Sequence, residues 1–476
     1  MPLTLTPQQT EALRRIRAFM KEPGNGVFIL KGYAGTGKTT LLQTLGKELK
    51  AADTNFSMLA PTGRAATVLR SRTGLEANTI HSELYLFRDV EGEPDQDLLA
   101  PAQDLFGQMR LIFSKRETDS EDRKLYIVDE ASMISDQPSE DVSYALFGSG
   151  HLLSDLLELA GNNKIIFAGD PAQLPPVGSI ESPALSEEYF RQTGRKVQSF
   201  ELTEILRQKA DSEILGLATR VRGITGRPSY PKWLKLPATD NARVSLMSYE
   251  RMKEAYFGHL GRNGFGESIA VCHSNRNCAD INRAVRTLFY GNAHAPLQVG
   301  DLLMVTQNNH LVPLSNGDFV SVMGVGERSH HVGLAFIDVR VKSQLSGVEY
   351  ECKLCEDLLE NGKPNLLSHQ QRRLMIDFSL RMRRQKIRPR TQAFFNALRK
   401  DPHLNSLRAN YGYAVTCNKS QGGEWPHVFF FLNKGMYIME RPSLARWWYT
   451  GITRAKERLY IASDWWIGEN RPEAFE

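Results

Sequence analysis

The stretch GYAGTGKT, at residues 32–39, decides the fold of this chain. It fits the phosphate-binding pattern G-x-x-x-x-G-K-[ST] and stands between an apolar run at 27–30 and a helical pattern. Glycines let backbone N–H groups close around phosphate oxygens, and the positive end of the following helix dipole lies there. We expect Lys38 to reach the β- and γ-phosphates and the Thr39 hydroxyl to bind Mg²⁺. The predicted nucleotide contacts are Gly35, Thr36, Gly37, Lys38, Thr39 and Thr40.

A second motif, YIVDE at residues 126–130, is acidic. P-loop ATPases hold Mg²⁺ and orient the attacking water with carboxylates at a strand end. We therefore expect Asp129 to bind the metal and Glu130 to act as the general base. The alternative is a solvated acidic pair at a strand end. The two motifs predict nucleotide hydrolysis only, because kinases, GTPases and motors all use P-loops.

Short apolar runs alternate with helical patterns along much of the chain, as in βαβ units. Each run is bounded by Gly, Pro or an acidic pair, which is typical of buried parallel strands. The first group of runs lies at 27–30, 58–60, 125–128 and 165–168, and the second at 268–272, 413–416, 428–432 and 459–462. We expect an α/β protein: the first group predicts a doubly wound parallel sheet with its ligand at the strands' carboxyl ends, and the second group predicts a second α/β domain.

Two segments interrupt this rhythm. Residues 319–325, 332–341 and 348–354 predict the strands of a small antiparallel barrel, and 86–122 is a shorter insertion with an acidic turn. Cys352 and Cys355 are expected to be ordinary barrel cysteines, because no second pair has the spacing of zinc ligands. A basic helical stretch follows the barrel strands. Its charged residues are Arg372, Arg373, Arg381, Arg383, Arg384, Lys386, Arg388 and Arg390.

Length and composition narrow the class of protein. The 476 residues suffice for two or three domains, and 41% hydrophobic with 24% charged residues is typical of a soluble globular chain. No apolar stretch approaches the roughly 18 residues of a membrane span. The N-terminal residues lack the apolar core of a secretion signal, and five cysteines make no disulfide framework, so we expect a reducing, cytoplasmic location. A formal charge of +5 permits a polyanionic partner without requiring one.

Seven motifs resemble, in order and over nearly the whole chain, those of superfamily 1 DNA helicases of the RecD/Dda-like 5′→3′ branch. Five of the quoted stretches are APTGRAA, TIHS, DEASM, GDPAQLPPV and LTEILRQ, at residues 60–66, 79–82, 129–133, 169–177 and 202–208. The last two are VTCNKSQG and YTGITRA, at 415–422 and 449–455. The resemblance implies two RecA-like domains that ATP draws together and hydrolysis releases.

The resemblance also implies roles for residues at the nucleotide. Gln173 would sense the γ-phosphate, and Arg207 and Arg454 would reach it from the second domain with permanently charged guanidinium groups. Gln421 would contribute to nucleotide binding. Gln9 has two readings. Family position makes it the adenine-binding glutamine, whereas helix chemistry makes it the third-position partner of a capping box with Thr6.

Further residues would hold single-stranded DNA through its backbone. The matched positions in the first domain are Thr62, Gly63, Arg64, His81 and Ser82, and those in the second are Asn275, Thr416, Asn418 and Lys419. His81 has an alternative as a satisfied histidine at a helix start. Asn418 departs from the branch, which usually has histidine there, and a neutral amide makes a weaker phosphate contact.

The resemblance divides the chain into four parts. Residues 1–200 would form the first RecA-like domain, with 86–122 as a hairpin wedge inserted in it. Residues 201–318 and 409–476 would form the second, interrupted by an SH3-like barrel and the basic helical insertion at 319–408. Phe87, Phe106 or Phe113 would supply an aromatic tip to the wedge, unless they belong to the core. The basic stretch has three readings: a DNA track, a surface for a protein partner, or a solvated helix face.

The expected activity is a 5′→3′ DNA helicase that uses ATP and Mg²⁺ on single-stranded and forked duplex DNA. A replication or recombination protein is a further expected partner, and no membrane is expected. One alternative is a DNA-dependent ATPase that chiefly displaces proteins or remodels forks. Another is a loader that uses ATP as a switch, although Glu130, Arg207 and Arg454 argue for hydrolysis. ATP turnover with and without single strands distinguishes the last reading.

Overall fold

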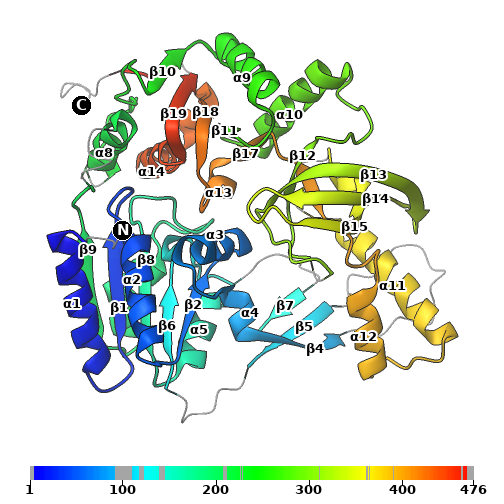
Figure 1. The fold of residues 1–476 in the computed structure, drawn as a ribbon, viewed down its shortest axis with the longest axis horizontal. Coiled ribbons are helices and arrows are strands. Elements are labelled where there is room, and N and C mark those ends of the chain that lie inside the picture. Colours follow the sequence, from blue (N-terminus) through cyan, green and yellow to red (C-terminus); the bar gives the residue numbers. More distant parts are fainter. Residues whose placement is uncertain are drawn as a thin grey trace.

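The chain forms two α/β halves, with a β-barrel and a pair of helices along one side (Figure 1). The computed structural model describes residues 5–91, 110–116, 123–138, 145–206, 212–225, 227, 229–309, 311–360, 363, 365–389, 391–462 and 465–468.

The first half is built on a parallel six-stranded sheet in the order β3-β2-β6-β8-β1-β9. Its strands are β1 Val27–Gly32, β2 Phe56–Ala60, β3 Ala77–Thr79, β6 Leu125–Val128, β8 Lys164–Gly169 and β9 Val197–Leu202. Its helices are α1 Pro7–Lys21, α2 Lys38–Ala51, α3 Gly63–Thr73, α4 Ile80–Leu84, α5 Leu152–Ala160 and α6 Glu187–Gln192. Two large apolar clusters lie against the sheet, so its central strands are buried on both faces, as their unbroken apolar runs predict.

The second half has a parallel five-stranded sheet in the order β10-β19-β18-β11-β17. The strands are β10 Val244–Met247, β11 Ser268–Cys272, β17 Ala414–Thr416, β18 Trp425–Phe431 and β19 Ala455–Ala462. The helices are α8 Glu213–Thr225, α9 Tyr249–Asn263, α10 Asn275–Tyr290, α13 Cys417–Ser420 and α14 Arg441–Ile452. The prediction of two α/β parts with parallel sheets is therefore confirmed.

The barrel is a five-stranded antiparallel sheet in the order β15-β14-β13-β12-β16. The strands are β12 Leu302–Val305, β13 Phe319–His331, β14 Leu334–Ser343, β15 Glu349–Cys355 and β16 Ala409–Tyr411. An isolated β-bridge joins Leu354 of β15 to Leu407, which lies just before β16. Because β15 and β16 are the two ends of the strand order, this bridge closes the sheet into a barrel. The sheet starts before residue 319 and ends after 408, because the short strand β12 pairs with β13 on one side and with the short strand β16 on the other.

Two smaller pieces lie beside the barrel. The insertion in the first half forms an antiparallel hairpin of β4 Tyr85–Glu91 and β5 Arg110–Lys115, which β7 Ala145–Phe147 extends. The helical pair is α11 Ser368–Arg384 and α12 Gln392–Lys400. Phe113 of β5 contacts the apolar cluster of this pair and stacks on Phe147, with ring centroids 4.6 Å apart. It is thus a packing residue, while Phe106 lies outside the described residues and the side chain of Phe87 is likewise not described.

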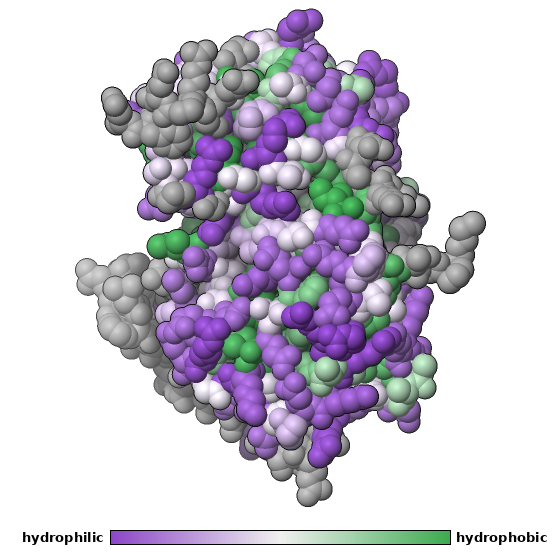
Figure 2. All heavy atoms as spheres, turned by 90° about the vertical axis from the view of Figure 1, so that its left-hand side faces the viewer, coloured by the Kyte–Doolittle hydropathy of each residue, from purple (hydrophilic) through white to green (hydrophobic). Residues whose placement is uncertain are grey.

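The face on the α1 side carries mostly hydrophilic side chains, with small separate hydrophobic areas (Figure 2). Among the helices of the described residues, none is both long and apolar enough to cross a bilayer. Cys352 and Cys355 lie on β15, and burial raises their pKa values to about 12 and about 11.

Candidate functional site: a nucleotide cleft between two α/β halves

The glycine-rich loop leads from the end of β1 into the first turn of α2. Gly37 is the N-terminal cap of α2 and has φ +79°. A Cβ at this position would also lie 2.3 Å from Nε2 of Gln9, so only glycine fits. Lys38 Nζ donates to the carbonyls of Gly32 and Tyr33, at 2.5 and 3.4 Å. The loop therefore has the backbone shape and the cation that a phosphate site needs.

The nucleotide-contact residues predicted around Lys38 lie together. The Thr36 hydroxyl donates to Tyr33 O at 2.8 Å and is almost fully buried. Thr39 and Thr40 follow Lys38 in the first turn of α2 and are half-buried. These positions put hydroxyl oxygens beside the lysine, where a hard cation bound to phosphate would find ligands.

Asp129 and Glu130 follow β6, on the same sheet edge as the loop after β1. Glu130 has φ +52°, a left-handed conformation that is strained for a residue with a side chain and is common at functional sites. Its backbone N–H donates to Oδ1 of Asp129 at 2.9 Å. Burial raises the pKa of Asp129, while Lys38 opposes that shift. Burial and, after it, the charge of Asp129 raise the pKa of Glu130.

Asp129 is buried and Glu130 is half-buried, and this carboxylate pair with raised pKa values is suited to a site that takes up positive charge. The Asp129 carboxylate and the Thr39 hydroxyl are the donors that would fit Mg²⁺, since both are hard oxygen ligands. The described residues contain no cluster of three His, Cys, Asp or Glu side chains that could hold a metal by themselves. The donor set thus suits a metal that shares its coordination with substrate phosphates and water.

The loop after β8 completes this sheet edge. Asp170 is fully buried there, and Gln173 is only 6% exposed. The Gln173 side-chain oxygen has no hydrogen-bond donor among the described residues, so this buried amide can still accept a bond. Because β6, β8 and β1 are neighbours in the sheet, the three loops that follow them meet at one place.

The second half reaches this place through α14. Tyr449 Oη donates to Asp170 Oδ2 at 2.8 Å and accepts from the backbone N–H of Ala34, in the glycine-rich loop, at 2.9 Å. Burial, followed by the charge of Asp170, raises the pKa of Tyr449 well above its usual value, so the hydroxyl keeps its proton. Nearby, Thr450 Oγ1 accepts from Leu174 N at 2.9 Å, and Gln421 Nε2 donates to Leu174 O at 3.0 Å. These four hydrogen bonds therefore join the two halves beside the nucleotide motifs.

Arg454 and Arg207 were both predicted to face the nucleotide. Arg454 is 5% exposed. Burial raises the pKa of Glu130, and the positive charge of Arg454 opposes that rise. Its N–H groups donate within its own half, to the Thr450 and Gly423 carbonyls and to the Thr453 hydroxyl. Arg207 lies outside the described residues.

The segment that leads toward position 207 lies against the glycine-rich loop. The backbone N–H of Leu206 donates to Gly35 O at 3.2 Å. Gln8 holds the start of this segment, because its side-chain oxygen accepts from the backbone N–H groups of Thr203 and Glu204, at 2.9 and 2.8 Å. Sequence reasoning missed Gln8, although a second amide next to Gln9 was a visible signal.

The hydrogen bonds of the Gln9 side chain bear on both interpretations of this residue. The capping box with Thr6 is present, with the Gln9 side-chain oxygen accepting from Thr6 N at 2.9 Å. Gln9 Nε2 donates to Thr36 O at 2.9 Å, which ties α1 to the glycine-rich loop. With the side chain 1% exposed and both amide atoms engaged, an adenine contact would require these bonds to be exchanged.

The predicted DNA contacts of the first half begin with α3. The Thr62 hydroxyl caps α3 by accepting from Ala65 N. Gly63 packs against Ser315, in the loop between barrel strands β12 and β13, and a Cβ at position 63 would lie 1.9 Å from the Ser315 Cβ. Arg64 stacks on Phe319 and Trp425, with its Cζ 4.7 and 4.6 Å from the ring centroids. Arg64 thus serves as an interdomain contact that sequence reasoning did not foresee.

Aromatic packing surrounds His81. Its ring lies 5.2 Å from that of Phe147 and 5.7 Å from that of Tyr85, and burial lowers its pKa, so the imidazole is neutral at pH 7. The Ser82 hydroxyl donates to Thr79 O. These two residues therefore sit at the base of the hairpin, where β4 leaves α4.

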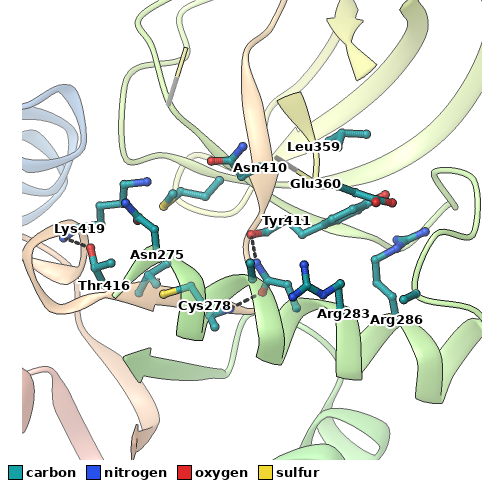
Figure 3. Close-up of a pocket in the computed structure, with 16 residues that line it drawn as sticks. Asn275, Cys278, Arg283, Arg286, Leu359, Glu360, Asn410, Tyr411, Thr416 and Lys419 are labelled. Carbon is teal, nitrogen blue, oxygen red and sulfur yellow. Dashed lines mark hydrogen bonds between the residues drawn. The ribbon is translucent and has the colours of Figure 1, made fainter. Parts of the chain in front are cut away.

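The DNA candidates of the second half converge. Asn275, Thr416 and Lys419 line one pocket between α10, the end of β17 and the barrel strand β16 (Figure 3). Burial lowers the pKa of Lys419, and Thr416 caps α13 by accepting from Lys419 N. Asn418 lies on the same short helix and is half-buried. One wall of this pocket is thus made by the barrel.

A P-loop pattern in one parallel α/β domain, hydrogen-bonded to a second parallel α/β domain, defines a class, the two-domain P-loop proteins. Residues 4–227 match the AAA domain model, and residues 411–462 match the UvrD-like helicase C-terminal domain. The chain is 24% identical to the ATP-dependent RecD2 DNA helicase of Deinococcus radiodurans over 451 residues, which cover 94% of this chain and 49% of that protein. It is 31% identical to the ATP-dependent DNA helicase dda of Enterobacteria phage T4 over 230 residues, covering 48% of this chain and 44% of that one.

The fold has a solved counterpart. A chain from the structural study of unwinding at forked duplex DNA by two coordinating Pif1 helicases matches with a TM-score of 0.52 and 16% identity, over 98% of this chain and 93% of that one. These matches support the predicted resemblance to superfamily 1 helicases of the RecD/Dda-like branch. It spans about half the length of the curated relatives it matches.

Proposed function

We propose that this chain is an ATP- and Mg²⁺-dependent translocase that moves 5′→3′ on single-stranded DNA and unwinds forked duplex. The observation that carries the proposal is the set of hydrogen bonds from Tyr449, Thr450 and Gln421 to the P-loop and to the loop after β8. A change at the γ-phosphate would alter the P-loop and the loop after β8, which are the loops hydrogen-bonded to the second half. Nucleotide chemistry is therefore coupled to the angle between the halves, which is what a stepping motor requires.

The geometry of the described residues supports the following roles at the nucleotide. Lys38 would hold the phosphates, Asp129 with Thr39 would hold Mg²⁺, and Glu130 would take the proton of the attacking water. The unpaired amide oxygen of Gln173 would orient that water beside the γ-phosphate. Arg454 and Arg207 would neutralise charge as the halves close, and Gln9 would meet adenine after giving up its bond to the loop.

The DNA path would run across both halves on the side of α3, α4 and α13. Thr62, Gly63 and His81 lie at the first half's part of this side, and the pocket of Asn275, Thr416 and Lys419 lies at the second half's part. Arg64, Ser82 and Asn418 flank the same path. We divide the chain as the resemblance suggests, with the barrel taken as 302–411, its paired strands, and the hairpin as the wedge.

Two of the relatives are named ATP-dependent DNA helicases, and the fold match comes from a study of forked duplex DNA. These names support the choice of DNA as the substrate, whereas the 5′→3′ polarity rests on the resemblance of the motifs. A cytoplasmic location and a replication or recombination protein as partner remain parts of the proposal.

The experiment is a pair of assays on the full chain. ATP turnover is measured with and without a single-stranded oligonucleotide, and unwinding is measured on forks with only a 5′ or only a 3′ loading tail. We expect turnover to rise with the oligonucleotide and unwinding only from the 5′ tail. Equal turnover with and without DNA would contradict the motor. DNA-stimulated turnover with displacement of a bound protein but no strand separation would instead support the remodelling ATPase.

A further inference from the structure

The helical pair beside the barrel concentrates the positive charge of the protein. Residues 368–400 contain ten Lys and Arg residues and one acidic residue, Asp377. Since the whole chain has a formal charge of +5, this segment carries +9 and the rest of the protein carries −4. We name as the basic surface the outward side chains of α11 and of the turn that follows it. They are Arg372, Arg373, Arg383, Arg384, Lys386 and Arg388.

The charges of α11 gather on one side of the helix. Its apolar residues Met375, Phe378 and Met382 are buried in the cluster shared with α12. The arginine pairs 372/373 and 383/384 are eleven residues apart, which is about three helical turns, so they share a face about 16 Å long. That face is opposite the buried one, and Arg373, Arg383 and Arg384 are exposed on it.

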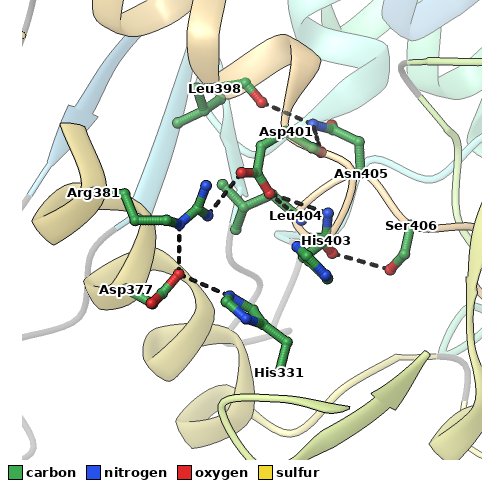
Figure 4. Close-up of polar contacts among 9 residues, drawn as sticks. All are labelled: His331, Asp377, Arg381, Leu398, Asp401, His403, Leu404, Asn405 and Ser406. Atoms are coloured by element: carbon green, nitrogen blue, oxygen red, sulfur yellow. Dashed lines mark hydrogen bonds and ion pairs between the residues drawn. The ribbon is translucent and has the colours of Figure 1, made fainter. Parts of the chain in front are cut away.

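The acidic residue of the segment is turned inward. Asp377 Oδ2 accepts from His331 Nε2 and from Arg381 Nε, each at 2.8 Å, and Arg381 also donates to Asp401 at 2.7 Å (Figure 4). This network ties α11 to the tip of β13 and to the loop after α12. None of the six side chains of the basic surface forms an ion pair with a described residue. Their charge is therefore available to a partner.

The backbone after α11 is strained at Lys386, and a glycine at that position would relieve the strain. Lys386 has φ +59°, and the N–H groups of Lys386 and Ile387 donate to the carbonyls of Arg383 and Met382. This is a Schellman ending, whose left-handed position normally holds glycine. A lysine there keeps one more positive charge on the surface in spite of backbone strain.

The basic surface is attached to the hairpin. Phe113 of β5 packs against the apolar cluster beneath α11, so the hairpin and the helical pair form one packed unit. Figure 1 shows this unit at the end of the molecule away from α1 and α2. The nucleotide-site loops lie elsewhere, where the two α/β halves meet, and the pocket of Asn275, Thr416 and Lys419 lies between α10, β17 and the barrel.

We infer that the basic surface binds the phosphate backbone of duplex DNA ahead of the fork, which rests on the proposed unwinding activity. A single-strand site combines charge with aromatic platforms for bases, but the exposed residues of α11 include no Phe, Tyr or Trp. A rigid row of arginines beside the hairpin suits two regular phosphate strands, which need no base contacts. A duplex bound to the basic surface would approach the hairpin at a fixed angle.

The test compares two variants with the same change of charge. Arg383→Gln/Arg384→Gln alters the basic surface, and Lys47→Gln/Lys50→Gln alters exposed lysines on α2, at the other end of the molecule. Binding of a fluorescein-labelled blunt duplex of about 20 base pairs, and of a single strand of equal length, is measured by anisotropy without ATP at about 50 to 200 mM salt.

We expect the arginine variant to bind the duplex roughly tenfold more weakly at low salt, with the slope of log K against log salt reduced by about 1.8, for two lost phosphate contacts. In single-strand binding, DNA-stimulated ATP turnover and thermal melting, the arginine variant should match the parent. The lysine variant should match the parent in all of these assays and in duplex binding. Arg383→Lys/Arg384→Lys should recover most of the duplex affinity. Unchanged duplex affinity, or an equal loss on single strands, would overturn the inference. The binding assay needs no ATP, so its outcome is separate from failure of the parent to hydrolyse ATP or unwind.

Discussion

Removing one atom, the hydroxyl oxygen of Tyr449, tests whether the hydrogen bonds between the halves couple their movement to ATP hydrolysis. Tyr449→Phe keeps the ring, which packs in the core of the second half, and removes only the oxygen that bridges Asp170 and Ala34. A hydrogen bond to a charged group contributes about 1.5–3 kcal/mol, and a neutral one about 1 kcal/mol. The variant should therefore lose roughly 2–4 kcal/mol of the free energy that joins the halves.

That loss should appear in turnover more than in nucleotide affinity. Each 1.4 kcal/mol is about tenfold, so if half of the lost energy acts on domain closure we expect kcat with saturating single-stranded DNA to fall about tenfold. The KM for ATP should change little, because Lys38 and the loop backbone remain. The assay is steady-state ATP hydrolysis across ATP and oligonucleotide concentrations.

The matched control is Tyr437→Phe. Tyr437 is 50% exposed, and its hydroxyl has no hydrogen bond to a described residue. It should behave like the parent in every assay. Parent-like kcat and parent-like stimulation by DNA in Tyr449→Phe, with unchanged thermal melting, would refute the idea that these hydrogen bonds couple the halves.

Three more predictions test the site and the wedge. Lys38→Ala and Glu130→Gln should each nearly abolish ATP hydrolysis, with Glu130→Gln still binding a fluorescent ATP analogue; parent-rate hydrolysis by Glu130→Gln would show that the base lies elsewhere. Burial raises the pKa values of Asp129 and Glu130, so both carboxyls stay protonated to a higher pH than usual. The rate of ATP hydrolysis should therefore rise with pH on the acid side of its pH profile, as these carboxyls lose their protons. An acid side that is flat would contradict this prediction. Phe113→Ala should loosen the hairpin from α11 and α12, at a cost of about 3 kcal/mol in packing, and slow fork unwinding while sparing DNA-stimulated turnover; unwinding at the parent rate would remove the hairpin from the mechanism.

The two parallel α/β halves were predictable because their evidence is local. A glycine-rich loop after an apolar run, and two carboxylates after another, are short contiguous patterns whose backbone requirements allow few alternatives. The strand β11 was predicted at its observed bounds for the same reason. The barrel edges were not predicted, because β12 and β16 are runs of four and three residues whose partners lie in distant segments.

Residue roles were harder to predict than motifs. Arg64 stands in a motif that resembles a DNA contact, yet its stacking partners Phe319 and Trp425 lie hundreds of residues away. The sequence leaves Gln9 open between two readings. The structure shows the capping box together with a bond to Thr36, and the adenine contact remains a prediction.

By itself, the sequence determined the chemistry that depends on neighbouring residues: the loop that can wrap phosphate, the carboxylate pair, and the order of family motifs. Only the tertiary structure decided how these pieces act on one another. Tyr449 meets Asp170 across 279 residues and Ala34 across 415. The physical reason is that a hydrogen bond needs its donor within about 3 Å of its acceptor. For groups so far apart along the chain, packing of the two halves sets that distance.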